Sequence, residues 1–406
     1  MDGQQLAVMD ADPVRSVFAA RALRDLGDGF SAVLLPVYLI SMGLSAGQIG
    51  VVATASLLGS ALMTLGLGMV GTRVDQRRLL IGASGLMIVS GLAFAVSGSY
   101  AAVLAIAFFG TINPSAGSVS VFVPLEHAIL SGHVADRDRT NIFARYSLIG
   151  ALAAATGALA AGSPDLLANI GMTQTTAIKA MFLLYAALGV ACAVVYARLP
   201  HARREATTVP TSVLGPSRSI VLRLAALFSI DSFAGGFAVQ SLLALWLFSK
   251  FGLSLTAAGL FFFWAGVLAA FSFPVAAWLS RRIGLINTMV FTHIPASLCL
   301  IGAAIAPRLD VALALLLVRS ALSQMDVPTR SSYVMAVVTP PERPAAASLT
   351  AVPRSLAAAL SPALAGALFE AGHVAMPLII CGVLKIGYDF ALLWTFRHVT
   401  PPEERR

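Results

Sequence analysis

The sequence predicts an all-α membrane protein with twelve transmembrane helices, arranged as two pseudo-symmetric bundles of six. Composition, the number of apolar segments and an internal repeat lead to this prediction. Of the 406 residues, 58% are hydrophobic and only 11% are charged, and the mean hydropathy is +0.85. Soluble proteins carry about 25% charged residues. The composition therefore excludes a water-soluble enzyme, a disordered chain, a collagen and a coiled coil.

Short polar breaks separate apolar runs that are long enough to cross a bilayer, which takes about 20 residues. In chain order, the predicted spans are 17–41, 46–70, 79–98, 101–124, 143–163, 176–198, 220–248, 255–280, 285–306, 309–329, 347–370 and 374–397. The N-terminal stretch has no basic region before an apolar run, so we do not expect a cleaved signal peptide.

Arginines mark alternate loops. One set of loops and the C-terminal tail contain Arg73, Arg77, Arg78, Arg137, Arg139, Arg203, Arg204, Arg218, Arg281, Arg282, Arg330, Arg343, Arg397, Arg405 and Arg406. The other set holds only Lys179, Lys250 and Arg308. Basic loops stay in the cytosol. We therefore expect a multi-pass protein of the plasma (inner) membrane with cytosolic termini, and the net charge of +8 needs no nucleic-acid partner.

A repeat divides the chain into two halves. Gly43-Leu44-Ser45 recurs as Gly252-Leu253-Ser254, and Arg145 matches Arg354, each 209 positions later. Six spans return the chain to the same side, so the halves are parallel copies. We predict an N-terminal bundle at 1–198, a cytosolic linker at 199–219 and a C-terminal bundle at 220–406.

The segment GLGMVGTRVDQRRLL, from Gly66 to Leu80, follows the second span. With the two six-span halves, it resembles the signature of the major facilitator superfamily of secondary transporters, in which a Gly and an Asp-Arg pair precede a basic cluster. Arg73 fits this signature, whereas Thr72 stands at the expected Asp. The resemblance implies a monomeric transporter whose two bundles rock about a central site. The sequence has no catalytic constellation and no metal-ligand spacing among its six histidines, so we expect no enzymatic activity, no metal and no cofactor.

Charges inside the spans are the most informative residues. An ionisable group at bilayer depth costs about 2.5–3.5 kcal/mol or more, so it faces a partner or a water-filled cavity. In the first span, Arg21, Arg24, Asp25 and Asp28 share one helix face, which predicts the i,i+4 pairs Arg21–Asp25 and Arg24–Asp28. The alternative to a cavity role is a salt-bridge ladder at the interface.

Asp28 and Asp231, in the first and seventh spans, are the candidates for proton coupling, because a carboxylate in a low-dielectric cavity can exchange a proton near neutral pH. The alternative for both is a static ion pair or a helix-cap bond. In the twelfth span, Lys385 and Asp389 are expected to form a structural pair.

Span ten carries a polar stripe at steps of four, three and four, formed by Arg319, Ser323, Asp326 and Arg330. The resemblance places this span at the central cavity, which makes Arg319 a clamp for an anion or substrate. Otherwise Arg319 is a counter-ion to Asp28 or Asp231. The full set of substrate-cavity candidates is Arg24, Asn113, Ser120, Arg319 and Ser323. For span four, helix packing through small residues is the equal alternative.

The predicted cytosolic gate pairs Asp326 and Arg330 with Arg354, and it pairs Glu126 with Arg145 in the first half. Arg73 and Arg282 belong to the same gate through the loops that carry them. We expect alternating-access transport of a small organic solute, as proton-coupled export of drugs or metabolites. The alternatives are uptake or exchange of a small organic anion through Arg319, and a non-transporting membrane sensor. The expected partners are the solute, protons and the lipid bilayer.

Overall fold

The computed structural model describes residues 12–70, 74–115, 120–133, 139–200, 215–339, 342–397 and 399. Within these residues the chain forms sixteen α-helices. The first eight are α1 (Pro13–Ser41), α2 (Ala46–Val70), α3 (Gln76–Val96), α4 (Tyr100–Phe109), α5 (Phe122–His133), α6 (Arg139–Ala160), α7 (Ser163–Ala168) and α8 (Gln174–Ala197). The linker expected at 199–219 falls largely outside the described residues.

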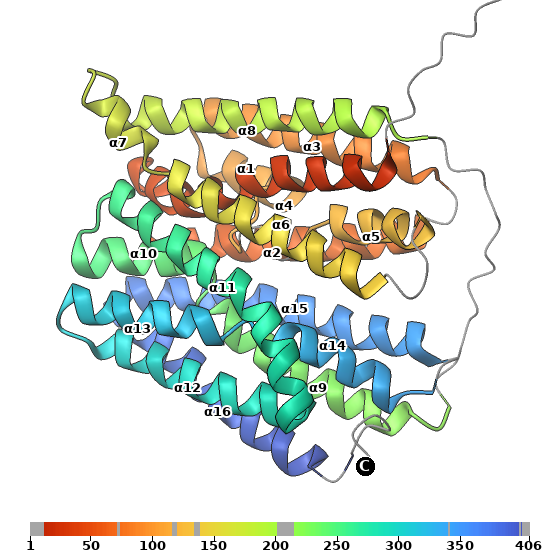
Figure 1. Ribbon diagram of the computed structural model, residues 1–406. Helices are drawn as coiled ribbons and strands as arrows, with labels where there is room; N and C mark the ends of the chain where they lie inside the picture. Colours follow the sequence, from red (N-terminus) through yellow and green to blue (C-terminus); the bar gives the residue numbers. More distant parts are fainter. Residues whose placement is uncertain are drawn as a thin grey trace, which may run out of the picture.

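The second half of the chain contains the other eight helices. They are α9 (Arg218–Gly236), α10 (Gln240–Phe251), α11 (Leu255–Ile283), α12 (Leu285–Ile305), α13 (Leu309–Leu322), α14 (Asp326–Val337), α15 (Arg343–Glu370) and α16 (Met376–Phe396). The halves lie one above the other in Figure 1, with α1–α8 above and α9–α16 below. Packing repeats between them: α1 contacts α6 as α9 contacts α15, and α3 contacts α8 as α12 contacts α16.

Ten segments of the described chain are long and apolar enough to cross a membrane. Two further segments complete the twelve. The first is α1, which has 29 residues but carries four charged residues in its first half. The second is α4 with α5, in which the apolar helix Tyr100–Phe109 is too short to cross alone. The fold is therefore the predicted twelve-span arrangement.

Three spans are broken near their middle. The fourth consists of α4 and α5, the seventh of α9 and α10, and the tenth of α13 and α14. The predicted end of the fourth span at residue 124 is wrong, because α5 continues to His133. Glu126, which lies just beyond the predicted end of this span, belongs to α5, and its side chain is buried. Non-helical backbone at membrane depth occurs where it is enclosed by protein or lines a cavity.

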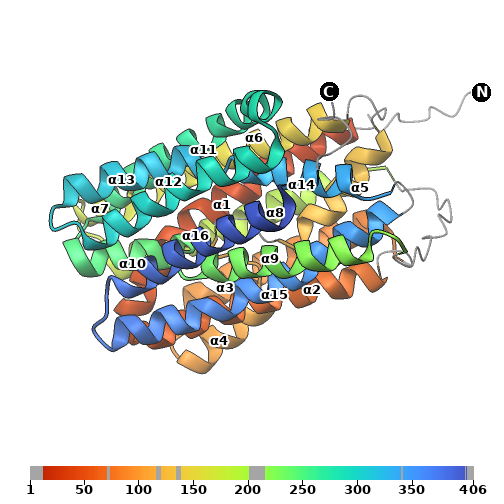
Figure 2. The same ribbon diagram turned by 90° about the horizontal axis from the view of Figure 1, so that it is seen from below.

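Both ends of the described chain lie at the same end of the bundle, where α1 begins and α16 ends (Figure 2). Arg77, Arg198, Arg282 and Arg397 mark this end, which we call the arginine-rich end. The other end, which we call the opposite end, carries the turns after α1 and α10.

The hydrophobic core is shared at one end and divided at the other. Toward the opposite end, one cluster joins the halves and includes Phe30, Tyr38 and Trp246. Toward the arginine-rich end, each half has its own cluster, one around Phe122 and Tyr196 and the other around Phe228, Tyr333 and Tyr388. Apolar burial therefore joins the halves at the opposite end, whereas at the arginine-rich end the described residues form a separate buried cluster in each half.

Close backbone packing and polar bonds seal the opposite end. A side chain at Gly50 of α2 would meet the Gly366 Cα atom of α15 at 2.8 Å, so these helices touch through glycine. The Ala363 N–H donates to Thr54 Oγ1 at 2.9 Å. Beside them, the Asp165 carboxylate accepts hydrogen bonds from the Thr256 N–H at 2.9 Å and the Thr256 hydroxyl at 3.0 Å. Asp165 thus caps the start of α11 in the other half.

Candidate functional site

The N-terminal half contains a buried charge cluster centred on Arg24 of α1. Its guanidinium lies 3.0 Å from the Glu126 carboxylate of α5 and 3.4 Å from Asp25. It also stacks over the Phe122 ring at 4.7 Å. The relative exposure of Arg24 is 1%. The predicted cavity position of this residue is therefore not observed, because Glu126 draws the side chain into the bundle.

Tyrosines complete the shell around Glu126. The Tyr196 hydroxyl of α8 donates to Glu126 Oε1 at 2.6 Å, and the Tyr146 hydroxyl of α6 donates to Oε2. Four helices therefore meet at one carboxylate. The expected pair of Glu126 with Arg145 does not form in this structure, because Arg145 is exposed on α6 while Arg24 occupies the carboxylate. For a state in which the arginine-rich end is closed, the pair stays a prediction.

Asp28 lies one turn further along α1 and is 1% exposed. The predicted pair Arg21–Asp25 forms, at 2.7 Å, but the predicted pair Arg24–Asp28 does not, because Glu126 and Asp25 hold Arg24. Asp28 instead accepts a hydrogen bond from the Tyr185 hydroxyl at 3.1 Å. In the described part of the chain, no cation lies within ion-pair distance of Asp28.

The C-terminal half contains a second cluster, centred on Asp231 of α9. Its two carboxylate oxygens meet different cations: Lys385 of α16 at 2.6 Å and Arg330 of α14 at 2.8 Å. Arg330 also forms the predicted i,i+4 pair with Asp326. Asp231 is 4% exposed, so this carboxylate is buried but has both of its oxygens paired with cations.

Sequence reasoning missed His293 of α12. Its Nδ1 atom lies 3.0 Å from the Asp389 carboxylate, and its Nε2 atom lies 3.3 Å from Lys385 Nζ. The expected Lys385–Asp389 pair is therefore wrong, since each residue has another partner. The available signal was a single histidine inside an apolar span, two residues before Pro295.

Arg319 of α13 is half-buried and lies apart from both clusters. Its electrostatic neighbours are the thiols of Cys299 on α12 and Cys381 on α16. Among the described residues it forms no hydrogen bond or ion pair through its side chain, so it is not a counter-ion to Asp28 or Asp231. Ser323 follows at the break after α13, where its N–H donates to the Arg319 carbonyl at 2.8 Å.

A pocket of about 170 Å³ lies between the halves, among α2, α5 and α15. It is lined by two predicted residues, Ser120 and Arg354, which the sequence had assigned to the cavity and the gate. Asn113 is buried at the break after α4, where its side-chain oxygen accepts the Ser115 N–H at 2.8 Å. Arg282 is exposed at the end of α11, and its guanidinium lies 5.0 Å from the centre of the Trp278 ring. Arg73 lies outside the described residues.

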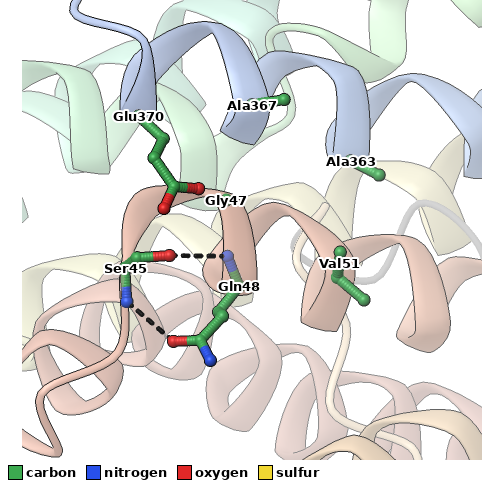
Figure 3. Close-up of a pocket in the computed structure, with 7 residues that line it drawn as sticks. All are labelled: Ser45, Gly47, Gln48, Val51, Ala363, Ala367 and Glu370. Carbon is green, nitrogen blue, oxygen red and sulfur yellow. Dashed lines mark hydrogen bonds between the residues drawn. The ribbon is translucent and has the colours of Figure 1, made fainter.

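A larger groove of about 550 Å³ lies at the opposite end, between the start of α2 and the end of α15 (Figure 3). Ser45 and Gln48 exchange hydrogen bonds there at 2.9 and 3.3 Å, which closes a capping box at the start of α2. Glu370 is the acidic residue of this groove. None of the predicted site residues lines it.

The comparisons with known proteins agree on the family. The family model of the Major Facilitator Superfamily matches residues 17–324, more than half of the chain. A curated relative, an uncharacterized membrane protein of Saccharomyces cerevisiae, is 24% identical and covers 94% of each chain.

Solved structures share the fold at low identity. An inward-facing, occupied bacterial homolog to the human lysosomal transporter Spinster is 14% identical, with a TM-score of 0.75 over 95% of this chain and 97% of that one. The nucleoside transporter NupG is 15% identical, with a TM-score of 0.74 over 95% and 100%. The human organic anion transporter MFSD10 (TETRAN) is 17% identical, with a TM-score of 0.64 over 94% and 100%. The chain thus belongs to the major facilitator superfamily, as a multi-pass secondary transporter and not an enzyme.

Proposed function

We propose that this transporter exports small amphipathic organic molecules and that protons drive the export through Asp28. The arginine-rich end faces the cytosol of a plasma (inner) membrane in this proposal, since basic loops stay on that side. The pocket between the halves supports an amphipathic solute, because most of its described lining is apolar and Arg354 is the one charged residue among the described lining residues.

The position of Asp28 carries the proposal. A carboxylate that is removed from water and has no paired cation favours its neutral form, so it binds and releases protons as its surroundings change. Asp28 has this environment, with 1% exposure and a tyrosine hydroxyl as its partner. Asp231, the other candidate, is held by Lys385 and Arg330. We therefore propose that Asp28 binds and releases protons. For Asp231 we propose a different role, in which the carboxylate changes its ion-pair partners.

Alternating access follows from the divided core. The halves, 1–198 and 220–406, move as two units joined by 199–219. In the structure they share apolar packing at the opposite end and separate toward the arginine-rich end. For the outward-open state, we propose that the arginine-rich end closes. The gate residues there are Arg73, Glu126, Arg145, Arg282, Asp326, Arg330 and Arg354.

The test measures protons and ligand together. Purified protein in weakly buffered detergent receives organic cations, anions and neutral drugs in turn, and a pH indicator records proton release or uptake. We expect at least one ligand class to give a proton signal in the wild type and in Asp231→Asn. We expect no signal from that class in Asp28→Asn. Ligand binding without a proton signal in the wild type, or an unchanged signal in Asp28→Asn, contradicts the proposal.

A second function is favoured by Arg319. Its guanidinium has no anionic partner among the described residues, so an organic anion that crosses by uptake or exchange would supply one. In proteoliposomes loaded with an organic anion, Arg319→Gln then slows anion exchange at least tenfold at any pH gradient. Full exchange in that variant removes this candidate.

A further inference from the structure

The pocket between the halves has an unusual charge arrangement. It lies among α2, α5 and α15 and has a volume of about 170 Å³. Its polar lining consists of three hydroxyl side chains, Thr64, Ser120 and Ser355, and one guanidinium, Arg354. The pocket lies toward the arginine-rich end, where each half has its own apolar cluster among the described residues.

Arg354 is the unusual residue of this pocket. It is half-buried and lies eleven residues inside α15, which corresponds to about 16 Å from the start of the helix. Among the residues that the structure describes, it forms no hydrogen bond or ion pair through its side chain. Its electrostatic neighbours lie on α9, α14 and α16, and none forms an ion pair with it. They are Asp231, Asp326, Arg330 and Tyr388. A guanidinium at this depth without an anion is costly.

The internal repeat shows that this placement is specific to the second half. Arg145 occupies the equivalent position in the first half, 209 residues earlier, and it is exposed on α6. The same residue type is therefore exposed in one copy and half-buried against the pocket in the other. Both copies of the repeat have an arginine at this position, but only the second-half copy lines the pocket. The repeat itself therefore does not explain why Arg354 faces the pocket.

Two of the three hydroxyl groups of the pocket donate within their own helices. Thr64 donates to the Ser60 carbonyl at 2.8 Å, and Ser355 donates to the Ala351 carbonyl at 3.2 Å. The Ser120 hydroxyl accepts the Phe122 N–H at 3.4 Å and keeps its own hydrogen for a ligand. The pocket thus offers a ligand one cationic fork, one hydroxyl donor and mostly apolar walls. This combination fits an anionic head on an apolar body.

We propose that this pocket binds the carboxylate of an amphipathic organic anion and that Arg354 holds the carboxylate through two parallel hydrogen bonds. The volume is below the range of about 300–1,000 Å³ that is typical of drug-sized sites, so it suits a single aromatic ring with its carboxylate. The proposal rests on the proposed transport function and adds to it the charge class of the solute. It also places the solute beside the Asp231 cluster.

The test uses benzoate with two probes of the same size, benzamide and benzylammonium. Binding of each is measured by calorimetry on the full chain in detergent, at a fixed pH and without a gradient. We expect wild-type protein to bind benzoate at least tenfold more tightly than benzamide or benzylammonium, as charge-assisted hydrogen bonds are about twice as strong as neutral ones. Equal binding of the three probes, or a preference for benzylammonium, overturns the proposal.

Variants place the site. Arg354→Gln is expected to weaken benzoate binding at least tenfold, and Arg354→Lys to retain part of it, because the charge stays while the fork is lost. Arg223→Gln is the matched control, because Arg223 is an exposed arginine of α9. It should bind as the wild type does. Melting temperatures confirm that each variant is folded.

Arg319→Gln separates the two candidate anion sites. If benzoate binding is lost in Arg319→Gln and kept in Arg354→Gln, the anion binds at Arg319 and the proposal for the pocket fails. These binding measurements do not depend on proton movement. A failure of proton coupling at Asp28 would therefore leave the result for Arg354 intact, and the two failures are distinguishable.

Discussion

Within the membrane spans, the described part of each half buries three carboxylates, and the two halves neutralise them differently. The first half encloses Asp25, Asp28 and Glu126, and the second half encloses Asp231, Asp326 and Asp389. Every carboxylate of the second set has a basic side chain against it, including the imidazole of His293 against Asp389. In the first set, Arg21 pairs with Asp25 and Arg24 with Glu126, and the one polar partner of Asp28 among the described residues is the Tyr185 hydroxyl.

The two clusters differ in the chemistry of these partners. A tyrosine hydroxyl carries no positive charge and cannot neutralise a carboxylate, whereas each carboxylate of the second set has a basic side chain against it. The buried carboxylates of the first half thus outnumber the arginines that pair with them. Our proposal assigns proton binding to this cluster, through Asp28, and ion pairing to the cluster around Asp231.

The largest expected effect comes from Arg24→Met. This change leaves Glu126 and Asp25 buried with less positive charge, and removing one partner of a buried pair costs about 3–5 kcal/mol. We expect the variant to unfold in detergent at a much lower temperature than the wild type. Lys385→Met is the matched variant, and it should lose less, because Asp231 keeps Arg330. Equal losses in the two variants would contradict the described difference between the clusters.

The next effect comes from His293→Gln, which makes the second cluster resemble the first. Asp389 then lacks a basic partner, and an incompletely paired buried group costs about 1–3 kcal/mol. We expect a lower melting temperature at pH 7. His127→Gln provides the control, since the His127 ring packs on Phe143 and Tyr146 instead of a carboxylate. If His127→Gln destabilises the protein as much as His293→Gln does, the Asp389 contact is not the cause.

Replacing the central aspartates should shift stability in opposite directions. Asp28→Asn removes a buried carboxylate that has no cation and keeps a side chain that can accept the Tyr185 hydrogen bond. We expect it to stabilise the protein by about 1 kcal/mol at alkaline pH, where the wild-type carboxylate is charged. Asp231→Asn should destabilise the protein, because it leaves Lys385 without its carboxylate. Thermal unfolding across pH 6–9 measures both changes, and a destabilised Asp28→Asn would argue against an unpaired carboxylate.

The smallest effect concerns Glu342, a carboxylate outside the membrane that joins the starts of α9 and α15. Hydrogen bonds from Ser217, Thr339 and the Gly215 N–H lower its pKa. A lowered folded-state pKa means that the stabilisation is present above the ordinary value of about 4.3 and is lost as the pH falls through the folded pKa. Exchange of the Gly215 amide hydrogen should therefore accelerate at acidic pH relative to an exposed amide. Glu342→Gln should abolish this acid dependence, and a persistent dependence would assign it to another group.

The sequence predicted the features that depend on local pattern. Apolar runs located the spans, the 209-residue repeat indicated two bundles, and i,i+4 spacing predicted Arg21–Asp25 and Asp326–Arg330. Pro114 and Pro124 predicted a kink in the fourth span, but the breaks inside the seventh and tenth spans were not predicted. Their non-helical backbone is tolerated because of tertiary contacts, such as the hydrogen bond from the Ser241 N–H to the Pro114 carbonyl at 3.0 Å.

Partners across long sequence distances could not be predicted. Arg24 and Glu126 are separated by 102 positions, and His293 and Asp389 by 96. Helical spacing says which residues share a face, but the packing of α1 on α5 and of α12 on α16 decides which faces meet. This is why Asp28 was paired with Arg24 in the prediction, although Arg24 has a stronger partner in the structure.

An infrared titration of Asp28 tests the central claim most directly. Protonated carboxyl groups absorb in a band that carboxylates and amides lack, so spectra of purified protein across pH 5–9 count buried carboxyl groups that titrate. We expect one such band to rise and fall in the wild type and in Asp231→Asn, and to be missing in Asp28→Asn. If the band is unchanged in Asp28→Asn, or lost only in Asp231→Asn, proton exchange belongs to another residue and the assignment to Asp28 is wrong.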